Sequence, residues 1–136
     1  MISIVEELKA YRNFAECILL EINWKNYMTT VELVFNYVWD KLGKIRHDVD
    51  CIQRVTLSCN LVQEIHFKGG LNPSMCSEPT QINWGINEVA LVRLQEQEDF
   101  LHPYHALPVP FHHLSVTWEF DRRIDIIFSN LDIRAI

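Results

Sequence analysis

The stretch that decides the fold runs from His113 to Ile133 and reads HLSVTWEFDRRIDIIFSNLDI. Its first part places apolar side chains at every second position with polar side chains between them, which is typical of a β-strand with one buried face. The polar residues 121–123 form a turn, and a second alternating run follows. The stretch therefore predicts an antiparallel hairpin. The alternation slips at Asn130, which predicts a bulge on the second strand.

Upstream runs repeat this period of two. Residues 18–24 and 31–39 alternate on either side of a short polar connection and predict a second hairpin. The run from Val55 to Phe67 keeps one parity but is long for a single strand, so we expect a bend or bulge near Asn60. Residues 88–95 are apolar on both parities, which suits a strand covered on both sides, with a helix as the alternative.

The N-terminus carries the only clear helical pattern. Ser3 and Glu6 have the spacing of a capping box, and the apolar residues behind them recur at helical intervals. We expect a short helix from Ile4 to Arg12 that stops at Asn13. Several strands with one short helix predict a mainly β fold, an antiparallel β-sandwich or open barrel. We expect one domain over residues 1–136, with the helix in 1–14 and the β-rich body in 15–136. The side chains expected between its layers are those of Trp24, Trp39 and Trp118.

Composition excludes several classes of protein. The chain has 136 residues, of which 49% are hydrophobic, and 12 basic against 18 acidic side chains give a net charge of −6. That charge argues against a nucleic-acid binder, which usually presents a basic face. No apolar run is long enough for a membrane span, and the N-terminus does not resemble a signal peptide, so we expect a cytoplasmic protein. The cysteines are expected to be reduced and largely buried: Cys17, Cys51, Cys59 and Cys76.

Catalytic signatures are missing from the sequence. It contains no glycine-rich phosphate loop, no G-x-S-x-G and no H-E-x-x-H, so we expect no catalytic residue and no cofactor. His102, His105 and His112 fall close together, and imidazole is a common metal ligand. Prolines interrupt the segment, which favours a histidine-rich surface loop. A metal-binding or small-ligand β-sandwich that uses these histidines is the alternative.

A family resemblance covers most of the chain, from Tyr27 to Ile133. It lies in the run VTLSCNLVQEIHF (residues 55–67), in NWGINEV (residues 83–89) and in the closing IIFSNLDI (residues 126–133). Taken in this order, they are similar to small bacterial immunity-type proteins encoded beside polymorphic or contact-dependent toxins. The resemblance implies a β-rich cytoplasmic protein that neutralises a cognate toxin by occluding it. It implies no catalytic residue.

These patterns together predict a non-enzymatic protein that acts by binding another protein. An acidic surface attracts a basic partner over a distance, and aromatic side chains anchor the contact. We expect a basic toxin domain as the partner, and neither a nucleic acid nor a membrane. The oligomeric state stays open. The contact should draw on the irregular segments and on nearby side chains, namely Asp48, Asp50, Glu96, Glu98, Asp99 and Tyr104.

Overall fold

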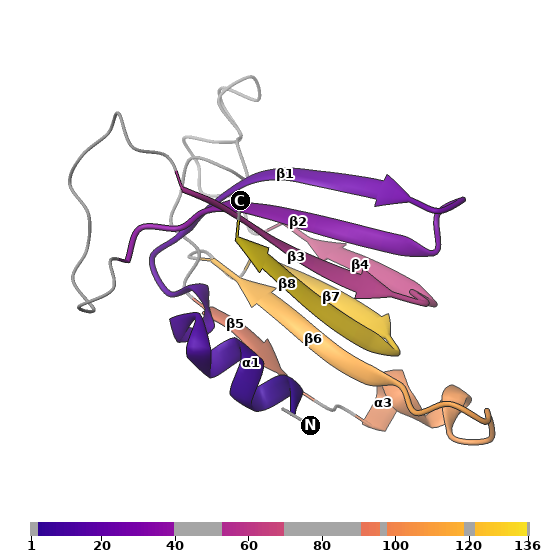
Figure 1. Cartoon of the computed structure of the whole chain (residues 1–136). Helices are drawn as coiled ribbons and strands as arrows, with labels where there is room; N and C mark the ends of the chain where they lie inside the picture. The colour runs from indigo at the N-terminus through magenta and orange to yellow at the C-terminus, as the bar shows by residue number, and fades with distance from the viewer. Residues whose placement is uncertain (1–2, 40–52, 70–90, 96–97, 119–121, 136) are drawn as a thin grey trace.

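The computed structural model describes residues 3–39, 53–69, 91–95, 98–118 and 122–135 (Figure 1). Its helical segments are α1 (Ile4–Ala10), η1 (Arg12–Phe14), α3 (Glu98–Leu101) and η3 (His102–Tyr104). Its strands are β1 (Ile18–Lys25), β2 (Thr30–Asn36), β3 (Arg54–Asn60), β4 (Glu64–Lys68), β5 (Leu91–Leu94), β6 (His112–Thr117), β7 (Arg123–Phe128) and β8 (Asn130–Ala135).

The strands form two antiparallel sheets. One sheet has the order β1-β2-β3-β8 and the other has the order β4-β7-β6-β5. The mainly β, sandwich-like architecture is confirmed, as are the β1–β2 and β6–β7 hairpins. In the part of the chain that the structure describes, no helix has the length and apolar character needed to cross a membrane.

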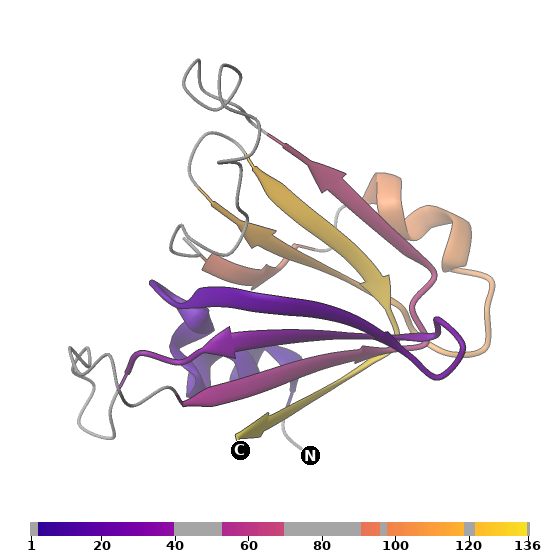
Figure 2. The ribbon, with the colours of Figure 1, turned by 90° about the horizontal axis from the view of Figure 1, so that it is seen from above.

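The sheets are joined at a corner where two long runs of sequence pass from one sheet to the other. β3 and β4 lie in different sheets, and so do β7 and β8 (Figure 2). The bend expected near Asn60 is confirmed, with the next residue, Leu61, in a left-handed backbone conformation (φ 55°). The bulge expected near Asn130 is instead a change of sheet at Ser129. The parity slips at Asn130, and a bulge within one strand and a change of sheet both produce such a slip, so the pattern does not tell a bulged strand from two strands.

Hydrogen bonds hold the two crossings together. The backbone amide of Ser129 donates to the backbone carbonyl oxygen of Asn60 over 2.9 Å. The side-chain amide of Asn60 donates to Asn130 over 2.7 Å, and its carbonyl oxygen accepts from the hydroxyl of Thr30 over 3.1 Å. These bonds fix the corner and pair the buried hydroxyl of Thr30 with Asn60.

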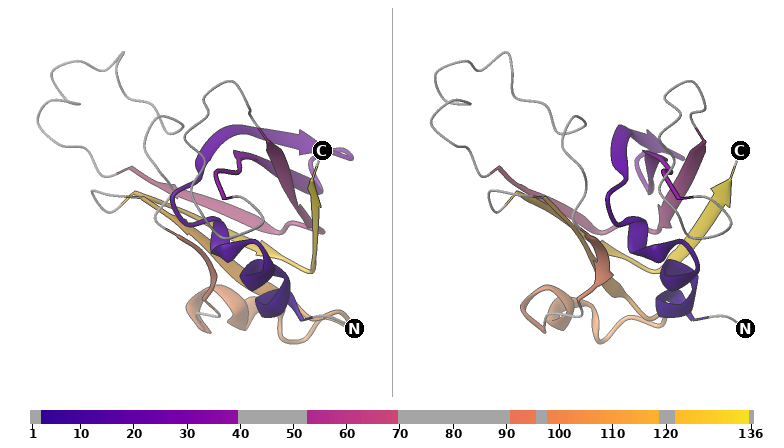
Figure 3. Two further views of the ribbon diagram at one scale, coloured as in Figure 1. Left: turned by 60° about the vertical axis from the view of Figure 1, so that its left-hand side comes forward. Right: turned by 90° about the vertical axis from the view of Figure 1, so that its left-hand side faces the viewer.

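The core lies between the sheets, and α1 with η1 packs at its β5 side (Figure 3). Leu8 of α1 and Phe14 of η1 are fully buried there, and the Phe14 ring packs 4.4 Å from that of Phe35. The expected capping box is present, because Ser3 and Glu6 each accept the other's backbone amide. The helix ends at Ala10, and Asn13 has a positive φ of 52°, a conformation that asparagine tolerates better than most residues.

The tryptophans divide between core and surface. Trp118 is 4% exposed, as predicted, and Trp39 packs partly buried against the core, where its indole donates to the carbonyl of Ala15. The prediction for Trp24 is wrong, because its side chain is 39% exposed. Trp24 pairs with the buried Val31, but it lies near the end of β1, which is an edge strand of its sheet among the residues that the structure describes.

Two further expectations concern the segment around residue 91. The strand predicted over residues 88–95 is confirmed for Leu91–Leu94. The prediction that this strand is buried on both faces is wrong, because Val92 is buried while Arg93 is exposed. The helix α3 was not predicted, because four residues are too few to establish a helical period.

Candidate functional site

The segment α3–η3 packs on the outer face of the second sheet. The ring of Phe100 lies 4.5 Å from the ring of His113 and 5.2 Å from that of His66. The hydroxyl of Tyr104 donates to the carboxylate of Glu64. This bond lowers the pKa of Glu64, while desolvation and the same bond raise the pKa of Tyr104 to about 12. The segment is therefore anchored to β4 and β6 at both of its ends.

Beneath Phe100 lies a buried polar cluster formed by His113, Ser115, Arg123 and Asp125. The carboxylate of Asp125 is 2.6 Å from Nε2 of His113, accepts the hydroxyl of Ser115 over 2.9 Å and pairs with Arg123 over 2.6 Å. Burial favours a higher pKa for Asp125, but hydrogen bonds from Arg123, His113 and Ser115 outweigh it and lower the pKa. The four side chains come from neighbouring positions on β6 and β7.

The cluster contains the residue types of a serine hydrolase but not their arrangement. In a catalytic triad the histidine takes the proton of the serine hydroxyl, and the carboxylate orients the histidine from its other side. Here Ser115 and His113 both contact the same oxygen of Asp125. The serine therefore donates to the acid and not to the base. The arrangement satisfies buried polar groups and stabilises the outer face of the sheet.

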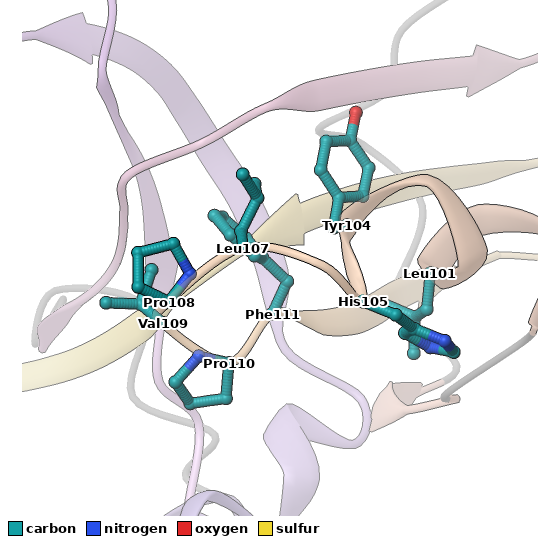
Figure 4. Close-up of a pocket in the computed structure, with 8 residues that line it drawn as sticks. All are labelled: Leu101, Tyr104, His105, Leu107, Pro108, Val109, Pro110 and Phe111. Atoms are coloured by element: carbon teal, nitrogen blue, oxygen red, sulfur yellow. The ribbon is translucent and has the colours of Figure 1, made fainter.

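A shallow pocket of about 360 Å³, lined mostly by residues of apolar type, is formed by the chain that follows η3 (Figure 4). Tyr104 and Phe111 form one part of its wall, with their ring centroids 5.2 Å apart. His105 supplies a polar group, and the residues from Leu107 to Pro110 complete the lining. The prolines restrict the backbone of this segment, so its shape does not depend on hydrogen bonds of a regular element.

The turns β1–β2, β3–β4 and β7–β8 lie at the same end of the molecule as this segment after η3 (Figures 1 and 2). Hydrogen bonds connect them in sequence. The backbone amide of Val62 donates to the carbonyl of Thr29 over 2.8 Å, which ties the β3–β4 turn to the β1–β2 turn. Ser129 bonds Asn60 through its backbone amide and Pro110 through its hydroxyl, over 2.9 and 3.0 Å. The turns thus form one continuous surface.

Most of the large hydrophobic side chains that are exposed in the described residues lie on or beside these turns. Tyr27 is 103% exposed and Met28 is 65% exposed, at the tip of the β1–β2 turn. Both have left-handed backbone conformations, with φ of 55° and 69°. We call this patch the end surface; its residues are Trp24, Tyr27, Met28, Leu61, Leu107 and Val109.

The residues predicted for partner binding are only partly placed by the structure. Asp99 is exposed on α3, and Tyr104 lies on η3, within one short segment. For Glu98 the structure describes the backbone alone, as part of α3. Asp48, Asp50 and Glu96 lie outside the described residues.

The histidines proposed as metal ligands are not brought to one point. The rings of His102 and His105 have centroids 5.8 Å apart. His112 lies in β6, where its ring is 5.9 Å from that of Phe128. Within the ranges that the structure describes, no three histidine, cysteine or acidic side chains are grouped to hold a metal ion.

The sequence pattern did not predict the end surface or the polar cluster. The sequence places Tyr27 and Met28 in a polar connection, and nothing in the pattern shows that Leu61 and Val109 lie at the same end. For the cluster one signal was available, because Asp125 lies within the otherwise apolar run of residues 124–128. A charged residue in such a run indicates a buried pair.

Comparisons with known proteins support the fold. No protein-family model matches the chain. No curated protein matches it either. Its fold is similar to that in the crystal structure of an uncharacterised protein from Neisseria gonorrhoeae, with a TM-score of 0.54 and 11% sequence identity. The match covers 90% of this chain and 94% of that one. At this identity the likeness shows a shared fold and nothing about activity.

Proposed function

We propose that this chain is a non-enzymatic protein-binding domain whose partner docks on the end surface. The observation that carries the proposal is the exposure of Tyr27 and Met28 on a turn that hydrogen bonds tie to its neighbours. Contiguous exposed apolar groups on a monomer mark interaction sites. Tyrosine, tryptophan and methionine are also the side chains enriched at protein interfaces.

The pocket beside η3 gives this surface a concave part. Its volume of about 360 Å³ suits one large apolar side chain of a partner, which would pack between Tyr104, Phe111 and the proline segment. The anchoring of Tyr104 to Glu64 holds the pocket in place before binding. A preformed pocket loses less conformational freedom on binding, and this increases affinity.

The chemistry of the partner follows from charge. The chain has a net charge of −6, so a basic protein is attracted over a distance and its association is accelerated at low salt. With the resemblance to immunity-type proteins, we propose a basic toxin domain as the partner and occlusion of that domain as the function. The buried cluster around Asp125 plays a structural part in this proposal.

Binding is tested with the product of a toxin-like gene adjacent to the gene of this chain. A complex should form, and its association rate should fall as salt rises. Replacement of Tyr27 by Asn together with Met28 by Gly should weaken binding at least about 30-fold, as loss of an interface hot spot does. The matched control is Leu20→Asn. It removes an exposed apolar group from the first half of β1, the strand that leads into the turn with Tyr27 and Met28.

Three outcomes would contradict the proposal at different points. No adjacent toxin-like gene, or no complex at low or high salt, removes the immunity role. If Leu20→Asn weakens the complex as much as the Tyr27/Met28 double variant does, the contact lies elsewhere than on the end surface. A complex that does not protect growing cells from the toxin leaves a binding domain without the function of neutralisation.

A further inference from the structure

A second cavity, about as open to solvent as the first pocket, lies at the β5 end of the second sheet, between α1 and β5. Its volume is about 280 Å³. Val5 and Leu8 of α1 form one wall, and Leu91 and Leu94 of β5 form the other. Figure 3 shows α1 lying beside β5, and the contacts between these two elements confirm the arrangement. The cavity shares no lining residue with the end surface or the polar cluster, although Arg93 is paired across β5 and β6 with Ser115 of that cluster.

Two cationic side chains line this apolar cavity, Lys9 from the helix and Arg93 from the strand. Both residues are exposed. None of the ion pairs that the described residues form includes either of them. The carboxylate of Glu6, one turn before Lys9, accepts the backbone amide of Ser3 in the capping box at the start of the helix. Both cations are therefore available to an anion.

The walls of the cavity are held by the fold. Leu8 is 1% exposed and belongs to the core. The side-chain amide of Asn13 donates to the backbone carbonyl of Val92 over 3.0 Å, which ties the chain after α1 to β5. A small-ligand site is usually preformed, mostly apolar and supplied with a few polar groups that fix orientation. This cavity has each of these properties.

We propose that the α1–β5 cavity binds a small aliphatic monocarboxylate, with the hydrocarbon chain between the helix and the strand and the carboxylate between Lys9 and Arg93. The volume of about 280 Å³ is close to the lower end of the range for small-ligand sites, so a short hydrocarbon chain fits it. The net charge of −6 opposes long-range attraction of an anion, so the affinity arises from local contacts. The apolar wall and the two cations therefore have to supply the affinity for the ligand together.

The test is a titration of the whole chain with octanoate, followed by calorimetry and by backbone amide chemical shifts. Saturable binding should shift the amides of Leu8, Asn13 and Leu94 and leave the end surface unchanged. Octylammonium and 1-octanol should bind at least about tenfold more weakly, because they lack the charge that the two cations recognise. These two ligands test the proposal on the unmodified chain.

Substitutions test whether Lys9 and Arg93 bind the carboxylate of octanoate. Lys9→Gln and Arg93→Gln should each weaken octanoate binding by about fivefold or more, and the double variant by more than either one. Lys25→Gln, the same change of charge on an exposed lysine of β1, should leave binding unchanged. Because both substituted side chains are exposed, the variants should keep the thermal unfolding midpoint of the unmodified chain.

Clear results would overturn the proposal. No saturable binding of octanoate excludes the ligand class. Equal affinity for 1-octanol, or no effect of either substitution, excludes recognition by Lys9 and Arg93. Tighter binding of a short peptide with a C-terminal leucine carboxylate, lost on amidation of that peptide, would assign the cavity to the C-terminus of a partner chain instead.

Discussion

The side-chain amide of Asn60 donates a 2.7 Å hydrogen bond to the side-chain carbonyl of Asn130, and the two residues are also paired across β3 and β8. One residue ends β3 before the chain crosses to the second sheet, and the other begins β8 after the chain has crossed back. The pair therefore marks the point where both crossings meet. The turns that carry the end surface adjoin this point.

Replacement of Asn60 by alanine should lower the free energy of unfolding by about 1–2 kcal/mol, because its side chain exchanges hydrogen bonds with both Asn130 and Thr30. Urea denaturation measures the change. Asn23→Ala is the control, since the Asn23 amide bonds only the exposed carboxylate of Glu21, two residues away on the same strand. Equal losses in the two variants would show that the corner bonds have no special role.

Replacement of Asp125 by asparagine should destabilise the fold by about 2 kcal/mol, as loss of hydrogen bonds to a charged group does, because Arg123 is partly exposed. Asp125 is 5% exposed and bonds three side chains. Asp132→Asn provides a matched comparison, because Asp132 also pairs with an arginine two residues away but is exposed on β8. That change should cost less than about 1 kcal/mol. Similar losses at both sites would contradict the structural role of the cluster.

The stability of the protein should fall in acid through Asp125. The pKa of its carboxyl is lower in the folded chain than its ordinary value of 3.8, so the stabilisation is complete above that value. It is lost as pH falls through the lower, folded pKa. Unfolding free energies of the unmodified chain and of Asp125→Asn should therefore converge below about pH 4. A difference that stays constant down to pH 2 would contradict this assignment.

Replacement of Met28 by glycine should leave the thermal stability unchanged or raise it slightly. Met28 has a φ of 69°, a conformation that strains residues other than glycine by about 1 kcal/mol. Glu32→Gly, placed in the regular strand β2, should instead destabilise by about 1 kcal/mol. Thermal unfolding of the two variants checks both expectations. The result also shows that Met28→Gly can report on partner binding without damage to the fold.

The thiols of Cys17 and Cys59 should resist alkylation in the folded protein. Both are buried, and desolvation raises the pKa of Cys17 to about 11 and raises that of Cys59 as well. Little thiolate is then present at pH 8. A variant with Cys51→Ser and Cys76→Ser leaves these two thiols alone, and iodoacetamide should modify it only when denaturant is added. Rapid modification without denaturant would show that the core opens readily.

Much of the fold could be predicted because alternation reports directly on burial. Val31, Leu33 and Phe35 have one parity and are all fully buried. The same rule failed for Trp24, because parity gives the face of a sheet but not whether a residue lies at an uncovered edge. It also could not separate β7 from β8, since the slip in parity at Asn130 is produced equally by a bulge in one strand and by a change of sheet.

The candidate site was harder to predict. Tyr104 was selected from an irregular segment and does line the pocket beside η3. The end surface, however, is assembled from residues as far apart as Tyr27 and Val109, and no local pattern connects them. The partners of Asp125 lie on a neighbouring strand, so its role depends on the register of β6 against β7.

The sequence by itself determined the capped N-terminal helix and the position of most strands, because the period of two and the capping residues act over a few neighbouring positions. Only the tertiary structure decided which strands share a sheet, which apolar side chains stay in water, and which charges meet in the interior. These properties depend on contacts between residues that are distant along the chain, where the geometry of the corner, and not local preference, sets the neighbours.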